Sequence, residues 1–574
     1  MSMQHQGPSA ILARAMALLS RGKHSDALIS LRAAHARFPK DFGIAIRHAD
    51  AAHLCRKLDE AIGAYRGALE LNAASVEAWY GLGCAQMAQR AFGAAVEALE
   101  AAVALAPDAG GILYNLGKGL FELGHVDDAI DRFRQAAAAG DPVLTELAYG
   151  SIACIIPGSD RATDADILQG RRDWARREAE KLRRPTRNHP ARASGAPLRI
   201  GYLSAFFGAR NWMKPVWGLI NHHDRARFEI HMFSQGGAPS PESGYRDRDR
   251  DYIHNITGVS NERAAEIVAG AGIDILVDLN GYSVQNRLPL MMLRPAPVIV
   301  GWFNMFATTG MEDFDWLVGD AEAIQPAEER HYVERVHRLP GTYLAFEVLY
   351  AVPDLAPPPS LRSGEPFRLA FGCLASQYKL TDRVLAAWGR ILRAVPSAEL
   401  TIGNAALGEQ STRDALLARL GRYGVEADRI TLQGPAEHFE FLRTYDRIDI
   451  ALDTFPYNGG TTTTEALWQG VPVLSFGGDR WAGRTSRSIL AAAGLSDWVM
   501  ADEESYVQRA IALAHDPDTP AMLAALRAGL RERLRSSPAC DTAGLCRAME
   551  SFYERIAADA ASRLTVPGGP AFGL

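Results

Sequence analysis

Residues 452–468 read LDTFPYNGGTTTTEALW and carry the sharpest structural signal in the chain. A short apolar strand ends at Leu452, two glycines allow a tight turn, and four threonines begin a helix. The first amides of a helix lack partners and carry partial positive charge, so this strand–turn–helix is suited to hold a diphosphate. The alternative is simple capping by threonine, which needs one hydroxyl residue and not four. The stretch therefore predicts a nucleotide site.

The sequence on both sides of this stretch alternates between strands and helices. In the same half, strands are predicted at 367–372, 399–402, 429–432, 448–452 and 472–475, and helices at 383–394, 411–423 and 461–469. The preceding half has predicted strands at 198–204, 228–233, 273–279 and 298–303, with a helix at 261–269. Such alternation indicates two parallel sheets covered by helices on both faces.

Proline-rich segments separate these halves from each other and from the N-terminal quarter. A linker is expected at 183–197 and a hinge at 353–366. Two doubly wound halves joined by a hinge predict a cleft between them, since ligands bind beyond the carboxyl ends of the strands. The last helical stretch, 522–557, is expected to pack on the second half or to cross back to the first.

The N-terminal quarter carries a repeat of 34 residues. Two series of alanines keep this spacing, with a large apolar residue between them: Ala27, Ala61, Ala95 and Ala129; Ala34, Ala68, Ala102 and Ala136; Leu31, Tyr65, Leu99 and Phe133. Two helices and their turns fill such a repeat, and their axes approach where the side chain is only a methyl group. The pattern resembles the tetratricopeptide repeat, in four copies across 8–143 with a helical cap at 145–182. A generic helical bundle would not keep eight small residues in register.

The composition and net charge of the chain exclude several classes of function. The 574 residues are 48% hydrophobic and 22% charged, which indicates several globular domains. The formal net charge of −6 gives no basic field for nucleic acid. No signal peptide or membrane-length apolar run is expected, and six scattered cysteines fit a reducing cytoplasm. An Asp-Arg-Asp run at 247–249 is interpreted as a solvated charged face, and no metal site is predicted.

The repeats, the GGTTTTEALW segment and an LRPAP segment at 293–297 together resemble glycosyltransferase family 41, the O-linked N-acetylglucosamine transferase and SPINDLY group. The resemblance implies an α-solenoid at 1–182 followed by a GT-B fold of two Rossmann-like domains at 198–352 and 367–574. It also implies an inverting glycosyltransferase with a UDP- or CMP-linked sugar donor and no cofactor.

The same resemblance implies the site residues. The diphosphate segment matches at Gly460, Thr461, Thr462 and Glu465, and Glu465 is expected to accept ribose hydroxyls. Asn458 lies in the same segment and is a further donor-binding candidate. In FGCLASQYK at 371–379, Ser376 is expected to contact the donor and Lys379 to neutralise the leaving diphosphate. From residue type alone, Lys379 could equally be a solvated lysine.

This sequence departs from the family pattern in the segments that the resemblance assigns to the donor sugar and to the catalytic base. Arg210 stands where the family has a histidine, and it can pair with an anion but cannot act as a base. Residues 302–310 lack the family's Pro-Gly. His254 matches a second active-site histidine and is the candidate to orient or deprotonate the acceptor, although lone histidines are often structural.

These observations predict a protein O-glycosyltransferase in which the repeats recruit a polypeptide and the cleft glycosylates its serine or threonine. A first alternative is a flagellin glycosyltransferase that uses a nonulosonic acid from a CMP donor, because Arg210 would suit a carboxylate-bearing sugar. A second is a non-catalytic repeat scaffold with a decayed transferase domain.

Overall fold

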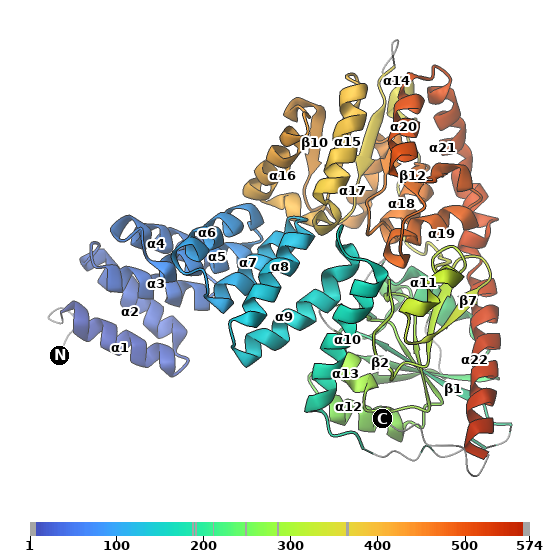
Figure 1. The fold of residues 1–574 in the computed structure, drawn as a ribbon, viewed down its shortest axis with the longest axis horizontal. Coiled ribbons are helices and arrows are strands. Elements are labelled where there is room, and N and C mark those ends of the chain that lie inside the picture. Colours follow the sequence, from blue (N-terminus) through green and yellow to red (C-terminus); the bar gives the residue numbers. More distant parts are fainter. Residues whose placement is uncertain are drawn as a thin grey trace.

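The computed structural model describes residues 7–185, 189, 192–193, 195–209, 212–246, 250–283, 286–362 and 367–565 (Figure 1). In this part of the chain a helical solenoid is followed by two α/β lobes, and the lobes stack one above the other beside the end of the solenoid. This arrangement confirms the predicted fold class.

The solenoid is built from antiparallel helix pairs and ends in a long helix against the first lobe. Its helices are α1 (Pro8–Ser20), α2 (His24–Arg37), α3 (Phe42–Leu54), α4 (Leu58–Leu71), α5 (Val76–Gln89), α6 (Phe92–Leu105), α7 (Gly110–Glu122), α8 (Val126–Ala138), α9 (Pro142–Ile155) and α10 (Asp164–Lys181). The repeated alanines are buried where helices approach. An added Cβ at Gly117 would lie 2.8 Å from the Phe133 ring, so the large residue of the repeat fills the groove beside a small one.

The first lobe contains a seven-stranded parallel sheet with the order β3-β2-β1-β4-β5-β6-β7. The strands are β1 (Leu198–Ser204), β2 (Phe228–Ser234), β3 (Tyr252–Asn255), β4 (Ile275–Asp278), β5 (Val298–Gly301), β6 (Trp316–Asp320) and β7 (Arg335–Leu339). Helices α11 (Lys214–His222), α12 (Asn261–Gly270) and α13 (Leu288–Met291) connect them. The central strands are buried along nearly their whole length, as expected for a sheet covered on both faces.

The second lobe contains a six-stranded parallel sheet with the order β10-β9-β8-β11-β12-β13. The strands are β8 (Ala370–Cys373), β9 (Glu399–Gly403), β10 (Ile430–Gln433), β11 (Ile450–Leu452), β12 (Val473–Phe476) and β13 (Val499–Met500). The helices are α14 (Pro359–Arg362), α15 (Asp382–Ala394), α16 (Gln410–Arg422), α17 (His438–Arg443), α18 (Thr461–Trp468), α19 (Thr485–Ala492), α20 (Glu503–His515) and α21 (Thr519–Arg535). In both sheets the order of the strands reverses beside the first strand of the lobe, which is where such folds bind ligands.

The last helical stretch was expected either to pack on the second lobe or to cross back to the first, and the structure shows one helix in each position. α21 packs on α18 of the second lobe, whereas α22 (Thr542–Thr565) crosses back and runs along the first lobe (Figure 1). There the Phe552 ring stacks on His337 with 4.0 Å between centroids, and the Tyr553 hydroxyl lies 3.3 Å from that of Tyr202. Helix α22 therefore ties the two lobes together.

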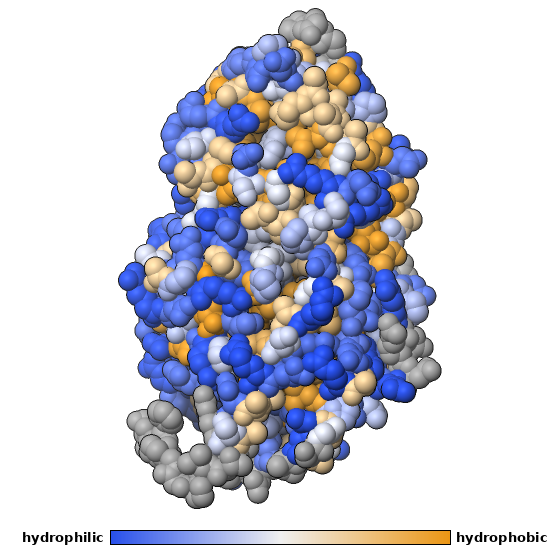
Figure 2. Space-filling view, turned by 90° about the vertical axis from the view of Figure 1, so that its right-hand side faces the viewer, coloured by the Kyte–Doolittle hydropathy of each residue, from blue (hydrophilic) through white to orange (hydrophobic). Residues whose placement is uncertain are grey.

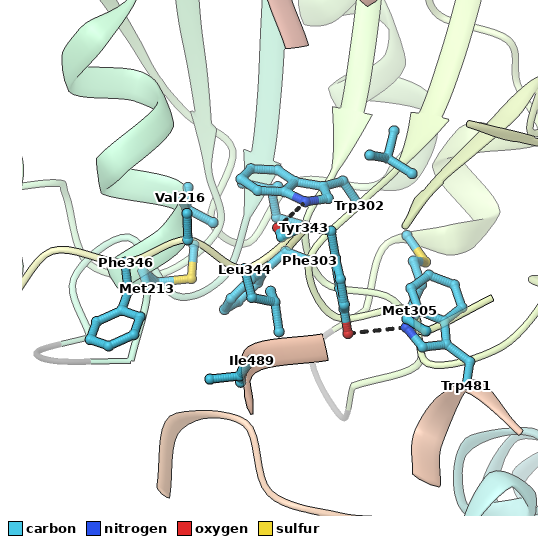
Figure 3. Packing of buried hydrophobic residues seen from close by; sticks show 14 of the residues in the cluster. Met213, Val216, Trp302, Phe303, Met305, Tyr343, Leu344, Phe346, Trp481 and Ile489 are labelled. Carbon is cyan, nitrogen blue, oxygen red and sulfur yellow. Dashed lines mark hydrogen bonds between the residues drawn. The ribbon is translucent and has the colours of Figure 1, made fainter. Parts of the chain in front are cut away.

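The two lobes share one continuous apolar core. Tyr343 of the first lobe lies at its centre, where its carbonyl accepts from Trp302 Nε1 at 3.1 Å and its hydroxyl accepts from Trp481 Nε1 at 3.0 Å (Figure 3). Ile489 of α19 packs into the same cluster from the second lobe. The cleft between the lobes is therefore closed at its base by packed side chains.

The solenoid is anchored to both lobes. Arg171 of α10 is buried and donates to the carbonyls of Ala153 and Thr308 at 3.1 and 2.6 Å. α6 packs so closely on α16 that a Cβ added to Gly93 would lie 2.3 Å from the Ser411 carbonyl oxygen. The face that carries the stacked lobes is largely hydrophilic, with apolar residues scattered over it (Figure 2). Among the described helices, none is long and apolar enough to span a bilayer.

Candidate active site

The turn before α18 is organised by a buried carboxylate. Asp453, directly after β11, accepts from the amides of Thr454 and Gly459 at 3.0 Å each and from the Ser475 hydroxyl at 2.6 Å. A Cβ at Gly459 would lie 2.4 Å from the Thr463 hydroxyl oxygen, so the glycine is needed for the chain to pass this close. Burial raises the pKa of Asp453, and these donors partly offset that rise. Asp453 was not among the site residues predicted from the sequence, although its place at the end of a strand is a recognisable signal.

The four threonines divide into two pairs. Thr463 and Thr464 are buried: the Thr463 hydroxyl lies 2.8 Å from that of Ser486, and the Thr464 hydroxyl donates to the Thr461 carbonyl at 2.7 Å. Thr461 and Thr462 remain half-buried at the start of the helix. The N-cap is Gly460, and it makes no side-chain cap. Threonine capping is therefore not the reason for this segment, and Thr461 and Thr462 stay partly exposed at the helix start, where an anion would meet the first amides of α18.

Lys379 lies against the same turn. It ends the short helical turn η5 (Gln377–Lys379) after β8, and its Nζ donates to the Asn458 carbonyl at 2.8 Å. The ammonium also lies 4.2 Å from the centroid of the Tyr457 ring. Burial lowers the pKa of Lys379 to about 8, although Asp453 nearby raises it in part. Lys379 and the α18 turn, 79 residues apart, are thus brought together.

Asn458 and Ser376, the two other donor-binding candidates in these segments, differ in burial and in their contacts. The Asn458 side chain donates to the Gly483 carbonyl at 2.7 Å and accepts from the Ser486 amide at 3.3 Å, so it fastens the turn to α19. Ser376 is exposed just before η5. These positions do not show whether Asn458 or Ser376 contacts a nucleotide-sugar donor. The donor-binding roles of both residues stay predictions.

Glu465 forms the centre of a buried charged cluster between the lobes. It is 4% exposed, and its Oε1 accepts from Lys214 Nζ at 3.0 Å and lies 3.0 Å from His438 Nε2. Burial by itself would raise the pKa of Glu465, but Lys214 and His438 lower it. Lys214 begins α11 of the first lobe, 251 residues earlier, and no local pattern could have shown this pairing. The expected contact of Glu465 with ribose stays a prediction.

A cavity of about 500 Å³ lies where the solenoid and the two lobes meet. Its lining is mainly aromatic and apolar and includes Phe121, Cys154, Arg171, Phe206, Trp212, Tyr282, Asn304, Phe306, Tyr378, Lys379 and Tyr457. A smaller pocket of about 60 Å³ adjoins the start of α18 and is lined by Gly460 and Thr461. Trp212, Asn304 and Phe306 line both spaces, so the two adjoin along these side chains.

The segment at 302–310 that departs from the family pattern forms part of this wall. Phe303 and Phe306 adopt φ angles of 72° and 57°, in the left-handed region that costs a residue with a side chain about 1–2 kcal/mol. Such a conformation is typical of segments that surrounding contacts hold in place at functional sites. The missing Pro-Gly is thus replaced by an aromatic loop in the cleft.

His254 is not brought into this cavity. It lies on the edge strand β3, with its Nε2 3.0 Å from His231 Nδ1 and its ring stacked on Phe233. Burial, and then the neighbouring His231, lower the pKa of His254. Among the described lining residues there is no histidine, aspartate or glutamate. Arg210 and the run at 247–249 lie outside the described residues.

The amino-acid sequence matches a known protein family. The sequence model named Glycosyl transferase family 41 matches residues 177–356 and 368–549, which is more than half of the chain. The chain belongs to glycosyltransferase family 41. The resemblance expected from the repeats, GGTTTTEALW and LRPAP is therefore confirmed.

Similar family 41 proteins come from plants and from a bacterium. The probable UDP-N-acetylglucosamine–peptide N-acetylglucosaminyltransferases SPINDLY of Solanum lycopersicum and Arabidopsis thaliana are each 32% identical, over 69% and 68% of this chain. The chain spans only 42% and 43% of their length. A variant of the Thermobaculum terrenum O-GlcNAc transferase is similar in structure, with a TM-score of 0.76, 31% identity, and coverage of 91% of this chain and 98% of that one.

Proposed function

We propose that this family 41 chain is a protein O-glycosyltransferase that moves a sugar from a nucleotide-sugar donor to a serine or threonine hydroxyl of a polypeptide. The observation that carries the proposal is the meeting of Lys379 with the turn that begins α18. A half-buried cation beside the start of a helix suits a diphosphate. The similar plant proteins are named as probable peptide N-acetylglucosaminyltransferases, which supports the choice of a polypeptide acceptor.

The proposed chemistry is a single displacement with inversion at the anomeric carbon. The acceptor oxygen forms a bond to that carbon, the bond from carbon to the diphosphate oxygen breaks, and its electron pair stays on the diphosphate. Lys379 and the amides at Thr461 and Thr462 would stabilise the charge that develops there, which is where preorganised donors act most strongly. The acceptor hydroxyl loses its proton to solvent during the step, because no histidine, aspartate or glutamate is among the described residues that line the cavity. His254 would have to move toward the cavity to accept it, because its ring is engaged at the sheet edge.

The solenoid supports the choice of a polymeric acceptor. Its last helices line the same cavity as Lys379, through Phe121 of α7 and Cys154 of α9. A polypeptide that follows the solenoid would therefore arrive at the site of transfer without crossing a second surface. Repeat arrays of this kind present extended binding surfaces.

The donor is tested by comparing nucleotide sugars with purified full-length chain. UDP-N-acetylglucosamine is tried first because the relatives are named for it, and a CMP-linked nonulosonic acid is tried because of Arg210. Donor hydrolysis is measured first. Intact masses of candidate acceptors, flagellin among them, are then compared after co-expression with and without the chain. Transfer of one sugar to serine or threonine supports the proposal. No binding or turnover of any donor would instead favour a non-catalytic scaffold.

A further inference from the structure

A second cluster of reactive side chains lies away from the cleft, between α11 and α22. His223 directly follows the end of α11, and Cys546 and Glu550 lie one turn apart on α22. All three are buried, with exposed fractions of 5%, 2% and 5%. Their ligand atoms lie within 4.8 Å of one another, and within the described part of the chain they form a compact group of metal-ligand side chains.

We propose that His223, Cys546 and Glu550 form a structural site for Zn²⁺ or a similar transition-metal ion. The distances support this. His223 Nδ1 lies 3.0 Å from Glu550 Oε1, and Cys546 Sγ lies 3.6 Å from that nitrogen and 3.7 Å from that oxygen. A circle through the three atoms has a radius of about 2.0 Å. An ion slightly out of their plane would therefore reach each of them at the usual zinc distances of about 2.0–2.3 Å.

The surroundings of the imidazole favour coordination through Nδ1. His223 Nε2 lies 2.7 Å from the Tyr202 hydroxyl. If the ring proton sits on Nε2 and is donated to this hydroxyl, Nδ1 is free to bind a cation. Such an outer partner fixes the tautomer and the ring orientation of metal-bound histidines. The Asp224 amide likewise donates to Glu550 Oε1 at 2.9 Å and positions the carboxylate.

Charge balance is also consistent with a divalent ion. A thiolate and a carboxylate would neutralise Zn²⁺, and the proton of the Cys546 thiol would leave for solvent on binding. Arg225 lies nearby, but it forms an ion pair with Asp251 at 2.7 Å. Arg227, 3.7 Å from the other Glu550 oxygen, is half exposed and also pairs with Glu554. The cluster supplies three ligands, so a water or the second Glu550 oxygen would complete a tetrahedral site.

The position of the site suggests its purpose. α22 is the segment that returns from the second lobe to the first (Figure 1). An ion held by His223, which follows α11, and by two residues of α22 would clamp this returning helix to the first lobe. The site is distinct from the proposed transfer chemistry, because none of its residues lines the cavity.

The test uses the full-length chain freed of metal by chelation and then titrated with Co²⁺ and Zn²⁺. We expect a thiolate-to-cobalt charge-transfer band that saturates at one ion per chain and disappears when Zn²⁺ displaces Co²⁺. Cys546→Ser should abolish the band and Glu550→Gln should weaken binding at least 100-fold. Cys540→Ser, which alters a half-buried thiol outside the cluster, should leave both unchanged.

Absence of the band from the parent chain would overturn the proposal and leave a hydrogen-bonded cluster only. A band that survives in Cys546→Ser would overturn it as well. Should a variant fail to fold, the stoichiometry in the parent still decides, together with the thermal midpoint, which Zn²⁺ should raise.

Discussion

Lys379 provides a pH-dependent test of the diphosphate site. Burial lowers its pKa to about 8, from an ordinary value of 10.5. The ammonium therefore loses its proton as the pH rises through about 8, so anion binding should be complete below this pH and decline above it. At pH 9.5 about 3% of the chains would carry the charge, compared with about 76% at pH 7.5, so the affinity for a nucleoside diphosphate should fall about 25-fold between these two pH values.

Two substitutions separate this charge from other effects. Lys379→Ala removes a charge-assisted hydrogen bond worth about 1.5–3 kcal/mol, which corresponds to an affinity loss of about 10- to 150-fold. Lys379→Arg stays charged up to about pH 12, so its affinity should stay nearly constant between pH 7.5 and 9.5. The exposed Lys118 of α7, changed to alanine, is the matched control and should have no effect.

Isothermal titration calorimetry with UDP, GDP and CMP at pH 7.5, 8.5 and 9.5 measures these affinities. The range begins above the second phosphate pKa of about 6, so the ligand's charge stays almost constant. The reasoning is refuted if Lys379→Ala binds within twofold of the parent chain, or if Lys379→Arg shows the same decline with pH.

Three further predictions concern the lobes and the solenoid. Lys214→Ala leaves the buried Glu465 carboxylate without its lysine and should reduce stability to urea by about 3–5 kcal/mol. Because the pKa of Glu465 is lowered in the folded chain, this stabilisation is complete above its ordinary pKa of 4.5 and fades as the pH falls, so the penalty should shrink in acid. His254→Ala should change the transfer rate less than about threefold, whereas loss of a general base costs about 10²- to 10⁴-fold. Gly93→Ala forces α6 off the second lobe and should cost about 1–3 kcal/mol, while Gly63→Ala, in open space on α4, should gain about 0.5–1 kcal/mol.

Each of these predictions has an opposing result. An unchanged urea midpoint in Lys214→Ala would show that the charged cluster does not join the lobes. A rate loss above 100-fold in His254→Ala would restore the histidine as the base. Equal midpoints for the two glycine variants would show that the solenoid is not packed against α16 in solution.

Much of the fold could be predicted because its signals are local. The strand, turn and helix at 452–468 follow from an apolar run, two glycines and a helix start, and the structure has β11 and α18 there. The predicted strands of both lobes appear with ends shifted by up to three residues. Strands β3, β6, β7 and β13 were not predicted. β3 and β13 are short edge strands, which carry little periodic signal.

The candidate site was predicted less completely. Lys379 and the α18 turn were expected together on the strength of the family pattern, and they do meet. His254 matched the same pattern but lies at the sheet edge, because β3 is the outermost strand of its lobe. A motif match indicates which residue corresponds to a position in the family, whereas the order of the strands decides whether that residue reaches the cleft.

The sequence by itself determined the solenoid of 34-residue repeats, the two doubly wound lobes and the helix start suited to a diphosphate. Each depends on periodicity or on neighbours within one turn, which the order of residues records directly. Only the tertiary structure decided that Lys214 pairs with Glu465 across 251 residues and that His223 meets Cys546 across 323. Burial of charged and thiol groups depends on which elements pack together, and that packing is set by the whole core and not by local pattern.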